Sequence, residues 1–358
     1  MVRYALQVNE ETMPRIPKIL LIVICSMMSA LSIMAADVHG AGPFKVVNKF
    51  PLAGEGRWDY LIVDNQSRRL FLSRTSHVVV LNADSGQSVG EVADTPGVHG
   101  IALAPELGVG FVSDGGENKV TVFDLQTLKT QEKIDTGGNP DSIVYDPDDK
   151  LVFVQNGKSS SSTVIDASSR KVVATIPMPG KPEFAVYDGK GSMYINIEDK
   201  SSIVHVDAAS KQVKDTWKLT GCEEPSGLAI DRKTRTLFAA CDNKVLAVVN
   251  ADSGKVSQTL PIGEDCDAVA YDPETGYVFA SAGAGKLTVI RKGKGGKYSV
   301  VQNLSSPPGS KTMALDAGKH QIYLPSAKFN GDPTGHPRPS VVPGSAAMLV
   351  IAGSKQGK

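Results

Sequence analysis

The chain has 358 residues, of which 38 are basic and 38 acidic, so its formal net charge at pH 7 is zero. Aromatic residues make up 6%, and 35 glycines with 21 prolines suit a globular protein with many turns. The sequence has no polybasic segment, which argues against a protein that binds nucleic acid mainly through its phosphates.

Residues 1–41 are typical of a secretory signal peptide. Arg15 and Lys18 precede an apolar run at positions 19–36, and this run ends in small residues. We expect cleavage after one of the alanines between positions 35 and 41. The alternative is an uncleaved single anchor, because 18 apolar residues just reach the length that spans a bilayer. Export predicts a periplasmic or secreted protein.

Residues 44–52, FKVVNKFPL, form the first predicted strand of the mature chain. This segment precedes the repeats described next, and it matches the fourth strand of a later repeat, KVVATIPMP at 171–179. The last repeat has no fourth strand of its own before the chain ends. We therefore predict that residues 44–52 supply it and close the ring, which would leave no long unpaired edge.

A unit of four short strands then repeats along the chain, and residues 140–181 show it best. Its apolar runs of four or five residues are separated by turns rich in Asp, Ser and Gly, and no helical period of 3.6 survives. An aspartate closes the first strand in six units, and Ala104 takes its place in the other unit. Consecutive positions of this kind lie 40 to 44 residues apart. These positions are Asp64, Ala104, Asp146, Asp188, Asp231, Asp272 and Asp316.

Seven four-stranded units with a period of about 40 to 45 residues are the signature of a β-propeller. We predict an all-β fold over residues 42–358, a seven-bladed β-propeller of four-stranded antiparallel blades. The motifs YDPDDKLVFVQNG at 145–157 and KVVATIPMPG at 171–180 resemble the YVTN-type repeat of YncE-like seven-bladed propellers, which are secreted or periplasmic bacterial proteins. The resemblance covers about residues 44–358. It implies a fold but little chemistry, because propellers serve binding, hydrolysis and scaffolding alike.

Three cysteines remain after the signal peptide. Cys222 lies in the connection that enters the fifth unit and Cys241 ends that unit's second strand, so both fall on one face of the meander. An exported protein meets oxidising conditions, and we predict a disulfide between them that contributes ~3 kcal/mol in the chain-entropy model. Cys266 is then a free thiol, an alternative partner for Cys241 or a soft metal ligand.

The candidate functional residues come from aligning the seven units with one another. Five positions before the end of each first strand lies a polar residue that should ring the mouth of the central channel. These residues are Asp59, His99, Asp141, Glu183, Ser226, Asp267 and Lys311. The acids and the histidine are predicted to bind a polar ligand, and Asp141, Glu183 and Asp267 to hold a divalent cation, Ca²⁺ or Mg²⁺. The alternative is a ring of acids that only contacts solvent.

The seventh unit has a long connection, residues 326–347, where other units use about four to eight residues. Loops of this length are usually functional or disordered. We predict that Arg338 reaches from it into the channel mouth. The alternative is that the loop only packs over the seam where the ring closes.

Three functions remain open at this point. The first is an exported binding or scaffold protein, a monomer whose channel mouth recognises a small polar ligand or a partner protein. The second is a metal-dependent enzyme of the lactonase or lyase kind, in which a cation polarises a carbonyl group. The third is a protein that binds single-stranded DNA by stacking bases on Trp58, Tyr60 and Phe184. No familiar catalytic motif favours the second.

Overall fold

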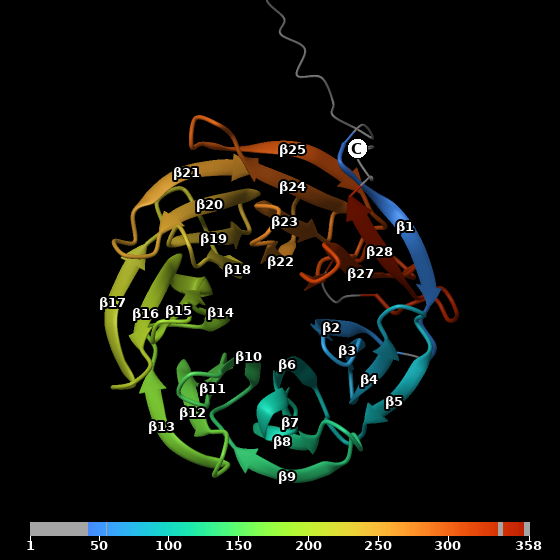
Figure 1. Ribbon diagram of the computed structural model, residues 1–358, viewed down its shortest axis with the longest axis vertical. Helices are drawn as coiled ribbons and strands as arrows, with labels where there is room; N and C mark the ends of the chain where they lie inside the picture. Colours follow the sequence, from blue (N-terminus) through green and yellow to red (C-terminus); the bar gives the residue numbers. More distant parts are fainter. Residues whose placement is uncertain (1–41, 55, 336–338, 354–358) are drawn as a thin grey trace, which may run out of the picture. The chain divides into compact units, whose positions relative to one another are not determined.

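The computed structural model describes residues 42–54, 56–335 and 339–353. The predicted signal peptide therefore lies outside the described residues. Within them the chain forms seven antiparallel sheets of four strands each, arranged as blades around a central channel (Figure 1). The all-β, seven-bladed fold predicted from the repeat period is confirmed. No helix in these residues is long and apolar enough to cross a membrane.

The first strand of each blade lies innermost, beside the channel. It packs against the innermost strands of the two neighbouring blades, as the contacts between β2, β6 and β10 illustrate. The innermost strands are β2 (Trp58–Asp64), β6 (Val98–Ala104), β10 (Pro140–Asp146), β14 (Pro182–Tyr187), β18 (Pro225–Asp231), β22 (Cys266–Tyr271) and β26 (Ala314–Asp316).

The second strand of each blade is almost completely buried. These strands carry the aromatic core residues of the repeat, such as Phe71, Phe153 and Phe238. Burial on both faces explains why they are continuous apolar runs in the sequence and do not alternate with polar residues. The second strands are β3 (Arg69–Arg74), β7 (Val109–Asp114), β11 (Leu151–Asn156), β15 (Ser192–Ile197), β19 (Thr236–Cys241), β23 (Tyr277–Ala282) and β27 (Gln321–Ser326).

The third strands complete the buried layer between neighbouring blades, where each hydrophobic cluster draws residues from two adjacent sheets. Two single-turn 3-10 helices, η1 (Pro105–Leu107) and η2 (Glu198–Lys200), lie in connections between strands. The third strands are β4 (His77–Asn82), β8 (Lys119–Asp124), β12 (Ser161–Asp166), β16 (Ser202–Asp207), β20 (Val245–Asn250), β24 (Lys286–Lys292) and β28 (Ala347–Gly353).

The outermost strands are mostly exposed, with few buried residues each, and they carry the exposed valines. In six blades the outermost strand is the last strand of its own repeat. In the seventh it is β1, which pairs antiparallel with β28 (Figure 1). The outermost strands are β1 (Phe44–Pro51), β5 (Ser88–Val92), β9 (Thr130–Asp135), β13 (Lys171–Pro177), β17 (Gln212–Lys218), β21 (Val256–Pro261) and β25 (Tyr298–Ser305).

The recurring aspartate that closes the innermost strand in six of the seven blades stabilises the turn and often the joint between two blades. Asp188, for example, accepts hydrogen bonds from backbone N–H groups of its own turn and forms an ion pair with Arg235 of the next blade. Asp272 is joined to His320 of the next blade in the same way, with 2.8 Å between Oδ2 and Nδ1. The repeat therefore encodes contacts between blades as well as the turns within them.

The fifth blade contains the disulfide predicted from the sequence. Cys222 and Cys241 are bonded, and their Cα atoms lie 5.4 Å apart. Cys266 is a free, buried thiol. It donates a weak hydrogen bond to the carbonyl of Ala268, and burial raises the pKa of its thiol well above the usual value.

We expect replacement of Cys222 and Cys241 by serine to lower the free energy of unfolding by about 3 kcal/mol, because the unfolded chain regains the freedom of a closed loop. Denaturant unfolding of the oxidised protein and the double variant measures this difference. Cys266→Ser serves as the control and should leave the disulfide in place. Peptide mapping without reductant that finds Cys266 paired to Cys241 would contradict the assignment.

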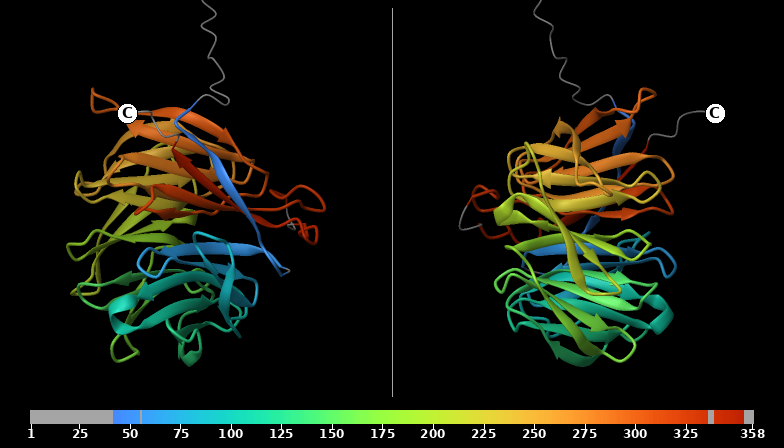
Figure 2. Two further views of the ribbon diagram at one scale, coloured as in Figure 1. Left: turned by 45° about the vertical axis from the view of Figure 1, so that its right-hand side comes forward. Right: turned by 90° about the vertical axis from the view of Figure 1, so that its left-hand side faces the viewer.

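The long connection between β27 and β28 is a hairpin on one face of the ring, seen as a projecting loop in Figure 2. Its two arms pair through a bridge between Phe329 and Val341 and a hydrogen bond from the Asn330 N–H to the Ser340 carbonyl. Arg57, just before β2, donates to the carbonyl of Pro339 at 2.6 Å. The loop is thereby joined to the first blade.

Candidate functional site

The seven polar residues found by aligning the repeats line a single cavity of about 440 Å³ at the channel mouth. They come from six innermost strands and from the segment just before the seventh. Chain positions 252 residues apart, Asp59 and Lys311, are thus brought into one site. The repeat predicts which residues share the mouth because every blade places its innermost strand in the same orientation.

A break in strand pairing directs these side chains. In blades one to six, the register between the innermost and second strands shifts within the first few residues, for example between Trp58 and Leu61 and between Pro140 and Ile143. The shift falls at the site residue each time. A bulge of this kind re-aims a side chain that regular pairing would fix on one face of the sheet.

The sequence did not lead us to predict a second set of residues, whose side chains donate hydrogen bonds to the backbone carbonyls of site residues. Ser113 donates to the carbonyl of Asp141 at 2.5 Å, Asn196 to that of Ser226 at 2.7 Å, and Ser281 to that of Lys311 at 2.6 Å. Each belongs to the second strand of the preceding blade. The fourth position of the second-strand motif is polar in five repeats (LFLSR, GFVSD, VFVQN, MYINI, VFASA). A polar residue within a buried strand needs a hydrogen-bond partner, and this feature of the sequence could have indicated these contacts.

The mouth is strongly acidic. Eight carboxylates and three basic groups line it among the described residues. Each basic group lies between two of the carboxylates. The contacts are His99 with Asp59 and Asp141, Lys181 with Glu183 and Glu198, and Lys311 with Asp267 and Asp265.

The distances distinguish a close from a distant partner for His99 and Lys311, whereas both carboxylates beside Lys181 are close. His99 Nδ1 lies 2.7 Å from Asp59 Oδ2 but 3.9 Å from Asp141 Oδ1. Lys311 Nζ lies 2.9 Å from Asp267 Oδ2 and 3.7 Å from Asp265 Oδ1. Ser226 also donates to Asp267 at 3.0 Å. Since one cation serves two carboxylates, the mouth keeps an excess of negative charge.

His99 carries a proton at neutral pH. Burial by itself would lower the pKa of this imidazole, but the hydrogen bond to Asp59 and the charges of Asp141, Asp59 and Glu183 outweigh it and raise the pKa to about 9. Both ring nitrogens of an imidazolium are donors, so His99 would have to lose a proton before either nitrogen could bind a metal ion.

The acids deepest in the cavity hold protons more tightly than ordinary carboxyl groups. Burial raises the pKa of Asp141, although the charge of His99 opposes the rise. Burial and the charge of Asp141 raise the pKa of Glu183, against the effect of Lys181. Burial, followed by the charges of Asp141 and Glu183, also raises the pKa of Tyr60 far above its usual value, so its hydroxyl stays protonated. A cation entering the mouth would favour ionisation of both acids.

The structure thus brings together Asp59, His99, Asp141, Glu183 and Asp267, while Arg338 lies outside the described residues. In the described residues, the group whose ligand atoms lie within 4.8 Å of one another is Asp59, His99 and Asp141. It shares only Asp141 with the predicted metal set, because Glu183 and Asp267 pair with lysines. Of the three predicted stacking residues, Tyr60 packs on Phe184 with 4.7 Å between ring centroids, and Trp58 packs on Phe329.

Comparison with known proteins identifies the fold. No protein-family model matches the chain, and no curated protein matches it. Among solved structures it is similar to Kuenenia stuttgartiensis hydrazine synthase, with a TM-score of 0.67, 17% sequence identity, and coverage of 76% of this chain and 93% of that one. The chain is a seven-bladed β-propeller. At this identity the likeness concerns the fold alone, so the function has to be inferred from the mouth itself.

Proposed function

We propose that this chain is an exported binding protein whose acidic channel mouth recognises a small cationic ligand. The observation that carries the proposal is the cavity of about 440 Å³ in which eight carboxylates outnumber three basic groups. Clefts lined by one sign of charge focus the electric field and attract ligands of the opposite sign. A fixed charge pair at 4 Å is worth on the order of 4 kcal/mol at the effective dielectric constant of a protein surface. Export is supported by the disulfide of the fifth blade.

The arrangement of charges suits an ammonium group. His99 and Lys311 each leave a second carboxylate incompletely neutralised, Asp141 and Asp265, so a ligand cation would complete pairs that already exist and would not create new ones. The same excess of negative charge would repel a phosphate backbone, which disfavours the binding of single-stranded DNA at this mouth.

A metal-dependent enzyme is the second candidate, and the cluster of Asp59, His99 and Asp141 favours it, because a histidine and two carboxylates can bind a divalent cation. The raised pKa of His99 opposes it: the imidazolium would have to lose its proton before Nδ1 or Nε2 became a ligand. Binding of a small organic cation requires no such step, so we place it first.

We expect 1,4-diaminobutane to bind the wild-type protein and to release protons, because the ligand favours ionised Asp141 and Glu183. Titration calorimetry in two buffers of different ionisation enthalpy measures both effects. Asp141→Asn with Glu183→Gln should weaken binding at least tenfold, since two charges are lost from the cavity. The matched control is Glu132→Gln with Asp135→Asn, two acids of the outermost strand β9.

Two outcomes would contradict the proposal. If the diamine gives no heat of binding with the wild-type protein, the proposal of a cationic ligand is wrong. Binding of Ca²⁺ or Mg²⁺ at stoichiometric amounts, lost in the Asp141/Glu183 variant and accompanied by no diamine binding, would instead favour the metal site. Elemental analysis of the purified protein provides the independent check on the metal.

A further inference from the structure

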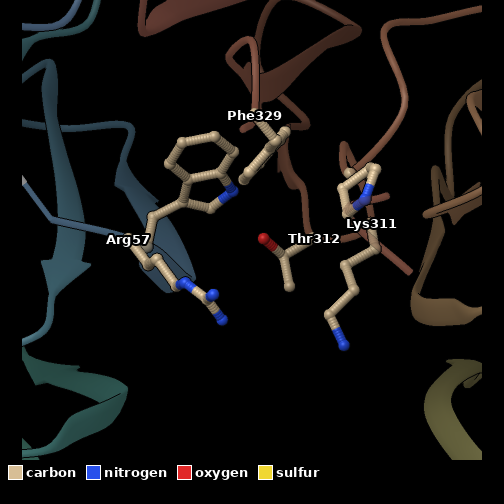
Figure 3. A pocket seen from close by; sticks show the side chains of 7 residues that line it. Arg57, Lys311, Thr312 and Phe329 are labelled. Atoms are coloured by element: carbon tan, nitrogen blue, oxygen red, sulfur yellow. The ribbon is translucent and has the colours of Figure 1, made fainter. Parts of the chain in front are cut away.

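A second, smaller cavity adjoins the acidic mouth between the first blade and the long hairpin of the seventh (Figure 3). Its volume is about 30 Å³, roughly room for two or three water-sized groups. Apolar groups form most of its wall, among them Trp58, Phe329 and Pro333. The centroids of the indole of Trp58 and the ring of Phe329 lie 6.0 Å apart. We call this cavity the side pocket.

The hairpin is fitted closely to the side pocket. Gly309 has φ +85°, and a Cβ atom there would lie 2.5 Å from Phe329 and 3.0 Å from Pro333. A side chain at this position would displace the aromatic wall. The hydrogen bond from Arg57 to Pro339 holds the same hairpin to the first blade. The wall is therefore positioned by packing and hydrogen bonding from two blades.

Lys311 lines both cavities. Its ammonium pairs with Asp267 in the mouth at 2.9 Å, and Figure 3 shows that the ends of Lys311 and Arg57 point away from Phe329. The aliphatic part of the lysine can therefore border an apolar space while its charge stays in the acidic cavity. A ligand that passes Lys311 would have one end in the acidic mouth and the other in the side pocket.

One polar atom in the side pocket has no partner. Thr312 is 3% exposed, and among the described residues its Oγ1 is buried without a hydrogen bond. Figure 3 shows this hydroxyl turned away from Lys311, toward the side of the pocket where Arg57 lies. A buried hydroxyl without a partner costs about 1–3 kcal/mol, so an occupant that supplies one hydrogen bond gains more than a purely apolar one.

We infer that the side pocket binds a short acylamino group, such as acetamide, at the end of the cationic ligand proposed above. The inference rests on the proposed function and names its ligand class: an amine whose other end carries a small amide. The methyl group contacts Trp58 and Phe329, and the amide forms a hydrogen bond with Thr312. The size of the pocket excludes a bulky acyl group.

Three monoamines with the same charge test the inference by calorimetry. N-(4-aminobutyl)acetamide carries the amide, 6-methylheptylamine replaces that amide by a hydrocarbon of the same shape, and butylamine has neither. We expect the amide to bind wild type at least tenfold more tightly than butylamine, because each buried methylene-sized group contributes about fourfold.

The deciding variant is Thr312→Val, which keeps the shape of the side chain and removes the hydroxyl. The ratio of amide to hydrocarbon affinity should fall about five- to tenfold, as for the loss of one hydrogen bond, while butylamine affinity stays unchanged. Phe329→Ala should reduce the affinity of both long amines and again spare butylamine. Because Phe329 belongs to a surface hairpin, this variant tests the apolar wall without changing a residue of β2.

Each negative result has its own meaning. If none of the amines binds wild type, both the proposed function and this inference fail. If all three bind equally, the side pocket is not used, and the acidic mouth alone remains. If the long amines bind more tightly but Thr312→Val leaves their ratio unchanged, the assignment of an amide opposite Thr312 is wrong.

Discussion

Deletion of residues 44–52 should abolish cooperative unfolding or lower the melting temperature by more than 10 °C. The deletion leaves the edge of β28 unpaired and removes the buried side chains of Phe44 and Phe50. Truncation of a single buried phenylalanine commonly costs about 3–5 kcal/mol, and an unpaired edge strand also invites aggregation. Thermal unfolding monitored by circular dichroism, together with size-exclusion chromatography, measures both consequences.

A point variant separates loss of packing from failure to fold. Phe44 packs edge-on against Tyr277 and Phe279, and its backbone exchanges two hydrogen bonds with the side chain of Gln302. Phe44→Ala should therefore lower the free energy of unfolding by about 3–5 kcal/mol. Val46→Ala, at an exposed position of the same strand, is the matched control and should cost much less. An unchanged melting temperature after deletion of the strand would refute ring closure by β1.

The second large effect is a loss of stability as the pH rises from about 6.5 to 9. In the folded protein the pKa of His99 is about 9, against about 6.5 in an unfolded chain. The folded state keeps a proton that the unfolded state has lost, so the contribution is complete below pH 6.5 and disappears as the pH rises through 9. Its size is on the order of 3 kcal/mol. The raised pKa of Glu183 acts in the same direction.

Replacement of His99 by glutamine should flatten this part of the pH dependence. The free energy of unfolding is measured in denaturant at several pH values for wild type, His99→Gln and the control His77→Gln on the third strand of blade one. A direct check is the titration of the His99 ring by NMR. A midpoint near 6.5, or equal slopes for wild type and His99→Gln, would show that the ion pair with Asp59 does not hold the proton.

Most of the architecture follows from local rules that the sequence expresses in every repeat. Turn residues such as Asp146, and apolar runs such as 151–155, fix where strands begin and end, because these preferences act over a few neighbouring residues. The repeat period then indicates which residues occupy equivalent places. The ring of mouth residues was predictable for this reason, since equivalent positions in a propeller lie at the same height. The pairing of Cys222 with Cys241 was predictable because the connection that enters a blade and the end of its second strand lie on the same face.

The chemistry of the mouth depends on contacts that no repeat specifies. Whether Lys311 pairs with Asp267, or His99 with Asp59, depends on side-chain direction at the register shift and on the rotation from one blade to the next. Burial raises the pKa of Asp141 and Glu183, and carboxylates of neighbouring blades raise that of His99, so these shifts arise only when the blades have met. Pattern alone therefore predicts an acidic ring but not three cations that each lie between two acids.

The sequence by itself determined the repeat, the strands, the fold and the set of residues at the channel mouth. Each of these follows from local preferences for turns and strands that recur at a regular period along the chain. The tertiary structure alone decided the side pocket. Trp58 and Phe329 are separated by most of the chain and meet only because the first and seventh blades are neighbours in the ring. Closure of the ring and packing of the hairpin bring together residues that are far apart in the sequence. These contacts bury the Thr312 hydroxyl in the side pocket without a hydrogen-bond partner among the described residues.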